Sequence, residues 1–94
     1  MTALRIIEDP GPLHSGKVQP GDMWRDPDGG WAGGESWRVI LPNGTCWGTN
    51  FTASDGGKWA TTGEPPEITV TPSIWDHAGP EWHGWIRGGQ FIDA

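Results

Sequence analysis

A pair of glycines near the end of the sequence is the feature that most restricts the fold, because it separates two strand-like runs. The run Trp-His-Gly-Trp-Ile-Arg at residues 82–87 precedes Gly88-Gly89, and Gln-Phe-Ile-Asp follows them. Glycine readily adopts the positive φ that type I′ and type II′ turns require, and these turns match the twist of paired strands. The sequence therefore predicts a β-hairpin centred on these glycines.

The alternation of side chains along this hairpin predicts which of them are buried. Successive side chains of a strand point to opposite faces of the sheet. Trp82 and Ile86 therefore share one face, which we expect to lie in the core. His83, Trp85 and Arg87 share the other face, which presents an imidazole, an indole and a guanidinium in a row.

Several other short runs also have the pattern of strands. Asn43-Gly44 separates two apolar runs, and this dipeptide is among the strongest hairpin signals. Residues 68–71 are β-branched and lie between Pro65-Pro66 and Pro72. Because proline cannot donate to a strand ladder, we expect this strand to end at Pro72, with residues 73–75 as an extended or turn segment. The remaining strand-like runs are residues 3–7, 21–25, 36–41, 45–47 and 58–61.

The content of glycine and proline sets the fold class. The chain has 16 Gly and 9 Pro among 94 residues, and it contains no helical period of useful length. We expect one domain over residues 1–94, in which residues 8–21 are a Pro/Gly-rich connector after a first short strand. The predicted fold is all-β, a small antiparallel sandwich, roll or partly open barrel of about six to seven short strands.

Tryptophan is expected to dominate the core. The chain contains 8 Trp although it is only 34% hydrophobic. Fully burying one indole removes about 200 Å² from water, which is worth roughly 5 kcal/mol. We therefore expect a core centred on Trp and most of the indoles to pack in it. The Trp residues that exceed what one small core would hide are Trp24, Trp31, Trp75, Trp82 and Trp85.

The charge and the cysteine content limit the partners. The formal net charge of −6 disfavours nonspecific nucleic-acid binding, which needs Lys and Arg against phosphates. It suits a basic partner surface or simple solubility. The single Cys excludes an internal disulfide, and the longest apolar runs are too short for a membrane span or a signal peptide. We therefore expect a cytosolic protein that contacts no membrane and binds no cofactor.

The side chains that could bind a soft or borderline metal ion are few. They are His14, Cys46, His77 and His83. They have neither the Cys-x-x-Cys nor the His-x-x-x-His spacing of a zinc motif. A site would require loops that bring His77 and His83 together with a carboxylate such as Asp76 or Glu81. The sequence therefore assigns no metal ligand.

The signals for catalysis are weak. The sequence has no nucleophile elbow, no phosphate-binding loop and no catalytic cysteine context. Asp76 and His77 are neighbours, as are Glu81 and His83, and Arg87 could bind an anion. Such neighbours occur in nearly any small acidic protein. The sequence therefore favours a protein that is not an enzyme, and it assigns no catalytic residue.

An aromatic surface is the better candidate for function. An exposed indole beside Arg can stack on a base, a sugar or the side chain of a partner. Trp85 and Arg87 provide such a pair on the outer face of the last hairpin, next to the loop that begins at Asp76. The predicted binding surface consists of Asp76, His77, Trp82, His83, Trp85 and Arg87.

Four segments carry a resemblance that covers most of the chain from about residue 20 onward. They are residues 21–24, 37–44, 63–74 and 83–89, and Pro72-Ser73-Ile74 and His83-Gly84-Trp85-Ile86-Arg87 are the most distinctive parts. In these segments the chain resembles an uncharacterised family of small proteins encoded by phages of actinobacteria. A distant branch of that family lies beside bacterial ubiquitin-like conjugation operons and has Cys pairs that suggest zinc. This chain lacks those pairs, so the inference of zinc does not transfer to it. The resemblance implies phage origin and expression inside the host cell.

These observations favour a phage accessory protein that binds a host protein or a small signalling ligand in the host cytoplasm. Counter-defence or host takeover is the expected setting. One alternative is a metal-dependent hydrolase or nuclease that uses His77 and His83. Another is a virion or assembly component. Short edge strands and surplus Trp would suit a homodimer in each case.

Overall fold

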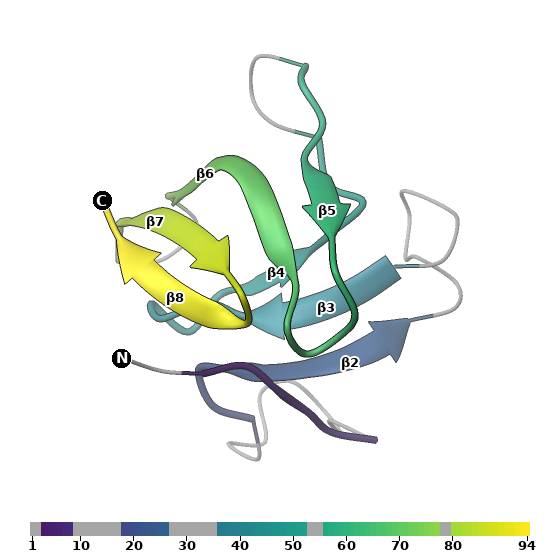
Figure 1. The fold of residues 1–94 in the computed structure, drawn as a ribbon. Helices are drawn as coiled ribbons and strands as arrows, with labels where there is room; N and C mark the ends of the chain where they lie inside the picture. Colours follow the sequence, from purple (N-terminus) through teal and green to yellow (C-terminus); the bar gives the residue numbers. More distant parts are fainter. Residues whose placement is uncertain (1–2, 9–17, 27–35, 53–55, 78–79) are drawn as a thin grey trace.

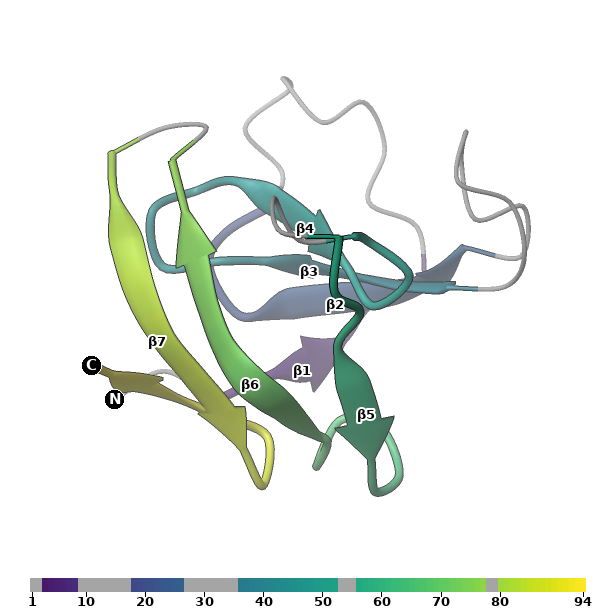
Figure 2. The same cartoon turned by 90° about the horizontal axis from the view of Figure 1, so that it is seen from above.

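The computed structural model of the protein describes residues 3–8, 18–26, 36–52, 56–77 and 80–94. Within these ranges the chain forms eight strands and no helix. The strands make two sheets of four strands each, which do not close into a barrel (Figures 1 and 2). The predicted all-β class is confirmed, with somewhat more strands than the sequence indicated.

The first sheet contains the strands of the N-terminal half in the order β1-β2-β3-β4. These are β1 (Arg5–Ile6), β2 (Asp22–Asp26), β3 (Ser36–Ile40) and β4 (Cys46–Gly48). β1 is parallel to β2, whereas the other neighbours are antiparallel. Gly44, in the turn between β3 and β4, has a φ of 87°. The hairpin predicted from Asn43-Gly44 is therefore confirmed.

The second sheet has the order β5-β6-β7-β8, and all its neighbours are antiparallel. Its strands are β5 (Ala60–Thr62), β6 (Thr69–Asp76), β7 (Trp82–Arg87) and β8 (Gln90–Asp93). Gly88 and Gly89 connect β7 to β8 with φ values of 54° and 78°. Along β7, burial alternates as predicted, with Trp82, Gly84 and Ile86 buried and the residues between them more exposed.

The hydrophobic core lies between the two sheets and draws on both. The fully buried side chains at its centre are aliphatic residues and one methionine, including Met23, Leu41, Ile68, Ile74 and Ile86. Trp47 and Trp82 belong to the same cluster, and Trp37 and Trp59 pack against it partly buried. The core therefore contains several indoles, as expected, but its most completely buried side chains are aliphatic residues and a methionine.

β6 differs most from its predicted form. The sequence placed its end at Pro72, but the strand continues to Asp76. Proline is tolerated inside a strand where the ladder is already interrupted by a bulge. The pairing of β6 with β7 shifts register between Val70 and Ile74, which is the position of Pro72. The proline therefore marks an irregularity within the strand and does not end it.

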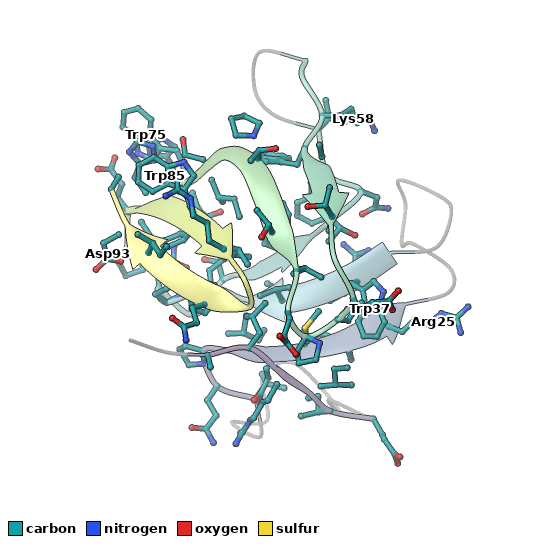
Figure 3. The ribbon with its side chains drawn as sticks, in the orientation of Figure 1. Arg25, Trp37, Lys58, Trp75, Trp85 and Asp93 are labelled. Atoms are coloured by element: carbon teal, nitrogen blue, oxygen red, sulfur yellow. The ribbon has the colours of Figure 1, made fainter. Side chains whose placement is uncertain are left out.

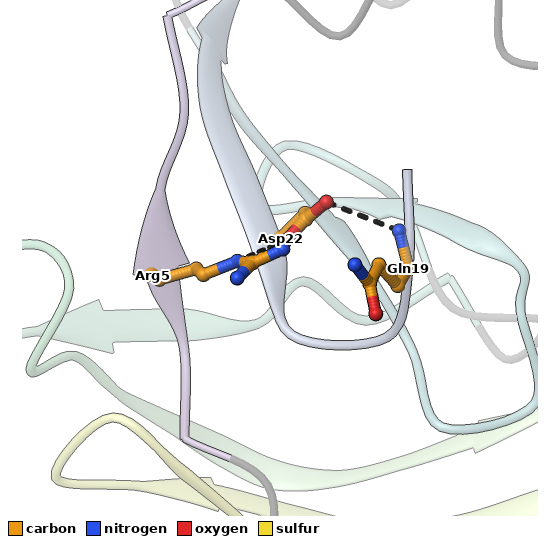
Figure 4. Close-up of polar contacts among 3 residues, drawn as sticks. All are labelled: Arg5, Gln19 and Asp22. Atoms are coloured by element: carbon orange, nitrogen blue, oxygen red, sulfur yellow. Dashed lines mark hydrogen bonds and ion pairs between the residues drawn. The ribbon is translucent and has the colours of Figure 1, made fainter. Parts of the chain in front are cut away.

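A buried carboxylate fastens the N-terminal strand to the first sheet. Asp22 is only 1% exposed. Its Oδ1 accepts a 2.6 Å hydrogen bond from Nε of Arg5, and its Oδ2 accepts one of 3.0 Å from the backbone N–H of Gln19 (Figure 4). A buried charge is costly unless it is paired, and both oxygens of this one have partners. Most of the predicted connector, with His14, lies outside the described residues, as does Trp31.

Candidate active site

Ser73 and His83 are joined by a side-chain hydrogen bond between β6 and β7. Nε2 of His83 lies 2.9 Å from Oγ of Ser73. Both residues are half-buried and lie on the outer face of the second sheet. A hydroxyl in contact with an imidazole is the arrangement in which the imidazole can remove the hydroxyl proton. This pair is the first feature of the structure that suggests covalent catalysis.

A β-bulge brings the two residues together. Val70 pairs with Ile86, and Ile74 pairs with Gly84. Between these pairs β6 has three residues, 71–73, where β7 has only Trp85. Bulges redirect individual side chains and are common next to active sites. Here the extra residues move Ser73 out of the regular ladder, so that its side chain can reach the ring of His83.

Trp75 stacks on the ring of His83. The two residues are direct partners across β6 and β7, and their rings lie 4.7 Å apart at an angle of 17°. The backbone C=O of His83 accepts a 3.0 Å hydrogen bond from the N–H of Ala94, so it points toward β8. Trp75 and His83 are therefore a pair without mutual backbone hydrogen bonds, the type in which side chains approach most closely.

A continuous row of side chains extends from this pair on both sides. The ring of Trp85 lies 6.1 Å from that of His83, and Cζ of Arg87 lies 4.9 Å from the Trp85 ring. On the other side, the ring of His77 lies 5.2 Å from that of Trp75. Figure 3 shows Trp75 and Trp85 close together beside β6 and β7. We refer to His77, Trp75, His83, Trp85 and Arg87 as the aromatic row.

The third member of a catalytic triad is absent from the described residues. In those ranges no carboxylate lies within hydrogen-bonding distance of His83. The nearby carboxylate of Asp76 instead accepts a 2.7 Å hydrogen bond from Nδ2 of Asn43. That Nδ2 also donates to the C=O of Pro80 at 2.7 Å, so Asn43 holds the end of β6 against the first sheet. The ring of His83 is oriented by Ser73 and by the indoles of the aromatic row.

A cavity of about 440 Å³ opens beside Ser73. Trp59 forms part of its wall and donates a 3.2 Å hydrogen bond from Nε1 to the backbone C=O of Ser73. The residues that line the cavity include aromatic side chains, one cationic side chain (Lys58) and one anionic side chain (Asp76). Its lining residues are Phe51, Thr52, Gly57, Lys58, Trp59, Pro72, Ser73, Trp75, Asp76 and His77. Ser73 therefore borders a space that could hold part of a bound molecule.

The residues predicted to form a binding surface are mostly, but not entirely, brought together. His77, His83, Trp85 and Arg87 lie in the aromatic row, with Asp76 next to it. Trp82 does not belong to this surface. It is 8% exposed, packs on Phe91, and donates from Nε1 to Asp93 at 2.9 Å. This position follows from the alternation along β7, which places Trp82 on the core face.

Ser73 and Trp75 are the site residues that the sequence analysis did not assign. Neither stands in a known catalytic motif, and the contact between Ser73 and His83 depends on the bulge. Two signals were nonetheless present in the sequence. A proline inside a β-branched run suggests a bulge, and the Pro72-Ser73-Ile74 segment carried part of the family resemblance.

The residues considered for a metal site are dispersed. Nδ1 of His77 lies 3.2 Å from Oε2 of Glu81, and both side chains are exposed. His83 contacts Ser73, and Cys46 lies in β4 of the other sheet. Among the described residues, no three His, Cys, Asp or Glu side chains are grouped as metal ligands would be. The same ranges contain no helix long and apolar enough to cross a membrane.

The second half of the chain matches a known protein family. Residues 43–93 match a family described as "Bacterial ubiquitination-like system serine protease (BubE)". The chain belongs to the BubE family. The matched segment contains β4 to β8, and with them Ser73, His83 and the whole aromatic row. Neither a curated protein nor a solved structure matches the chain.

BubE membership corrects the function predicted from the sequence. The prediction of a non-enzymatic phage accessory protein that binds host factors is wrong, because the family is described as a serine protease of a bacterial system. The metal-dependent hydrolase that would use His77 and His83 is not supported either, since His83 contacts a serine. The resemblance to an uncharacterised family of small proteins is confirmed only in part, because the family that matches is BubE and phage origin is not shown. Phage origin stays a prediction.

Proposed function

We propose that this chain is a serine hydrolase that cleaves an amide bond of a protein substrate, in the setting of a bacterial ubiquitination-like system. The observation that carries the proposal is the 2.9 Å contact between Nε2 of His83 and Oγ of Ser73. The description of the BubE family as a serine protease supports it. Ser73 is the nucleophile and His83 the general base.

The first half of the reaction transfers the acyl group to Ser73. Oγ attacks the carbonyl carbon of the substrate while Nε2 of His83 accepts the hydroxyl proton. The resulting tetrahedral intermediate collapses, the C–N bond breaks, and the Nε2–H of His83 donates its proton to the leaving nitrogen. The amine departs and an ester remains on Ser73.

The second half releases the acid and restores the serine. A water molecule loses a proton to Nε2 of His83 as its oxygen attacks the ester carbonyl. The bond between that carbon and Oγ then breaks, and His83 returns the proton to Ser73. The net change is the addition of one water across the amide bond, with no other reactant.

The aromatic row takes the place of an orienting carboxylate. In a triad, a buried carboxylate fixes the imidazole and stabilises the imidazolium that forms during the reaction. Here the stacked indole of Trp75, at 4.7 Å and 17°, restricts rotation of the ring. The face of an indole also attracts a cation, by about 0.5–1 kcal/mol at exposed sites. Trp75 is therefore a positioning residue that acts through His83.

A probe that reacts with activated serines provides the test. An alkyl fluorophosphonate should add once to the folded protein, and peptide mass spectrometry should locate the adduct on Ser73. Ser73→Ala should abolish labelling. The matched control is Ser36→Ala, which removes another serine at the start of β3 in the other sheet, and this variant should label like the wild type.

Three results would contradict the proposal. The first is the absence of labelling in folded wild-type protein. The second is labelling that persists in Ser73→Ala. The third is labelling of Ser73 at the rate of an ordinary surface serine, unchanged when His83 is replaced by Ala. Circular dichroism of each variant verifies that the loss of labelling is not a loss of fold.

A further inference from the structure

The second half of β6 has an open edge on the side of the candidate active site. β5 pairs with β6 only at Thr69, Val70 and Thr71, through Thr62, Thr61 and Ala60. β6 continues to Asp76, and beyond Thr71 the described residues provide no neighbouring strand on that side. Figure 2 shows β5 beside the first part of β6 and diverging from it toward the β6 arrowhead. An unpaired strand edge is a template for another strand.

The backbone groups of Trp75 point toward this open edge. Trp75 faces His83, whose C=O points to β8 and bonds with Ala94. In an antiparallel pair of this type, the N–H and C=O groups of both residues point away from each other. The N–H and C=O of Trp75 therefore point away from β7. They face the side on which β5 pairs with the first residues of β6. The C=O of Ser73, two residues before, points the same way, because it accepts the bond from Nε1 of Trp59.

The open edge of β6 lies along the cavity, and Ser73 is one of the residues that line it. Pro72, Ser73, Trp75 and Asp76 line the cavity from β6, and residues 57–59 line it from the segment that leads into β5. A strand placed along the open edge would therefore lie in the cavity. Its backbone would pass within a residue or two of Ser73, because Trp75 is only two positions farther along β6.

From this arrangement we propose that the substrate binds as an extended polypeptide segment, antiparallel to β6 in the row that β5 leaves vacant. One residue of the segment would exchange two hydrogen bonds with the backbone N–H and C=O of Trp75. Binding by added strands draws affinity from main-chain hydrogen bonds and specificity from side-chain pockets. The inference rests on the proposed function, and it names the substrate class as unfolded chain, such as a tail or an exposed loop.

The site is suited to an extended chain more than to a small charged ligand. Lys58 and Asp76 both line the cavity, so its lining has no strong preference for a ligand of either charge. The cavity volume of about 440 Å³ is in the range that holds a few residues. The neighbouring indoles offer apolar contact to side chains on one face of the segment, while the edge of β6 offers backbone partners.

Two probes with the same reactive group provide the test. One is a diphenyl phosphonate analogue of acetylated alanine, and the other is the same compound extended by two alanines. We expect the extended probe to inactivate the wild-type protein at least about tenfold faster, since two added hydrogen bonds are worth roughly that factor. The measurement is the second-order rate constant for modification of Ser73, followed by intact mass.

Two variants of Trp75 separate the contribution of its backbone N–H from that of its indole. Trp75→Ala and Trp75→Pro both remove the indole, but only proline removes the N–H. Because that N–H faces the open edge, proline should not break the ladder with β7. We expect Trp75→Ala to retain the rate advantage of the extended probe and Trp75→Pro to lose about a threefold part of it, because one of the two hydrogen bonds is removed. The short probe should react with both variants at similar rates.

A series of extended probes with one N-methylated amide each makes the same test on the wild-type protein, so the outcome does not depend on the folding of Trp75→Pro. One methyl position should reduce the rate about threefold or more by blocking the bond to the C=O of Trp75, which is one of the two bonds. If both alanine probes react at equal rates, or every N-methyl probe matches the parent, the strand-binding inference is overturned while the serine chemistry stands. If neither those probes nor the fluorophosphonate labels Ser73, the proposed function fails and the inference fails with it.

Discussion

Each sheet of this protein contains one polar pair that joins two neighbouring strands, and the two pairs differ in kind. Arg5 and Asp22 join β1 to β2 in the first sheet, where they are direct partners in a regular register. Ser73 and His83 join β6 to β7 in the second sheet, across a register shift. The first pair is ionic and the second is not. The first is completed by a backbone N–H of Gln19, whereas the second lies beside a cavity.

The difference separates a structural contact from a reactive one. Both oxygens of Asp22 are buried and have partners, so this carboxylate can stabilise the fold but is not available to another molecule. Oγ of Ser73 has one partner among the described residues, Nε2 of His83, and Ser73 is one of the residues that line the cavity. The same kind of cross-strand contact therefore serves stability where the sheet is regular, and becomes available for chemistry where a bulge interrupts it.

The largest expected effect is that of His83→Ala on the reactive pair. Removing the general base should slow fluorophosphonate labelling of Ser73 about a hundredfold or more, because proton transfer by a positioned base contributes that much. The free energy of unfolding should change little, since His83 is half-buried on the outer face. The measurements are the labelling rate and urea unfolding. Added imidazole should restore part of the rate in this variant.

A matched histidine provides the control for that result. His77 belongs to the same aromatic row but contacts Glu81 instead of Ser73. His77→Ala should label within about twofold of the wild type, because an exposed ion pair contributes little. Equal losses in the two variants would mean that the row as a whole, and not the hydrogen bond to Ser73, sets the reactivity.

Substitutions in the pair of Arg5 and Asp22 should instead lower the free energy of unfolding and leave the labelling of Ser73 unchanged. Asp22→Ala should lower the free energy of unfolding by about 2 kcal/mol, because it leaves the N–H of Gln19 without its acceptor and removes a buried partner of Arg5. Arg5→Ala should lower it by a similar amount, about 2 kcal/mol, because the buried carboxylate of Asp22 loses its charged partner although the Arg5 side chain is itself 61% exposed. Urea unfolding measures both. A fall in the labelling rate of the folded Asp22→Ala protein would show that the two sheets are coupled.

Removing the indole of Trp75 should slow the labelling of Ser73 less than removing His83 does. Trp75→Ala should slow labelling by about tenfold, since the ring of His83 loses its stacking partner and the face that favours its charged form. Trp75→Phe should restore most of the rate, because a phenyl ring can stack in the same place. Trp75 is 55% exposed, so neither change should greatly affect unfolding. A fully active Trp75→Ala would exclude a positioning role.

Much of the fold could be predicted because it follows from local rules. The glycines at 44, 88 and 89 determine two hairpins through their positive φ values. The two-residue alternation along β7 determines which side chains are buried. Tryptophan content was a poorer guide, because it does not state where an indole lies. The centre of the core consists of Met23, Leu41 and Ile residues that are individually inconspicuous in the sequence.

The candidate site could be predicted only in part, for a reason of geometry. His83, Trp85 and Arg87 lie on one face because they alternate along one strand. Ser73 reaches His83 only because three residues of β6 face one residue of β7, and a bulge of this kind depends on pairing between distant segments. The open edge of β6 likewise depends on where β5 ends. Neither feature is determined by a run of neighbouring residues.

Arg87→Ala should have the smallest effect, and it tests how far the aromatic row acts as one unit. Arg87 is exposed and lies over Trp85 at 4.9 Å, a contact worth about 0.5 kcal/mol at such a site. Trp85 is farther from His83 than Trp75 is, at 6.1 Å compared with 4.7 Å. Labelling of Ser73 should therefore stay within about twofold of the wild type, as in an Arg25→Ala control in the other sheet. A loss as large as that of Trp75→Ala would mean that Arg87 positions His83 through Trp85, and the reactive pair would then depend on the whole row.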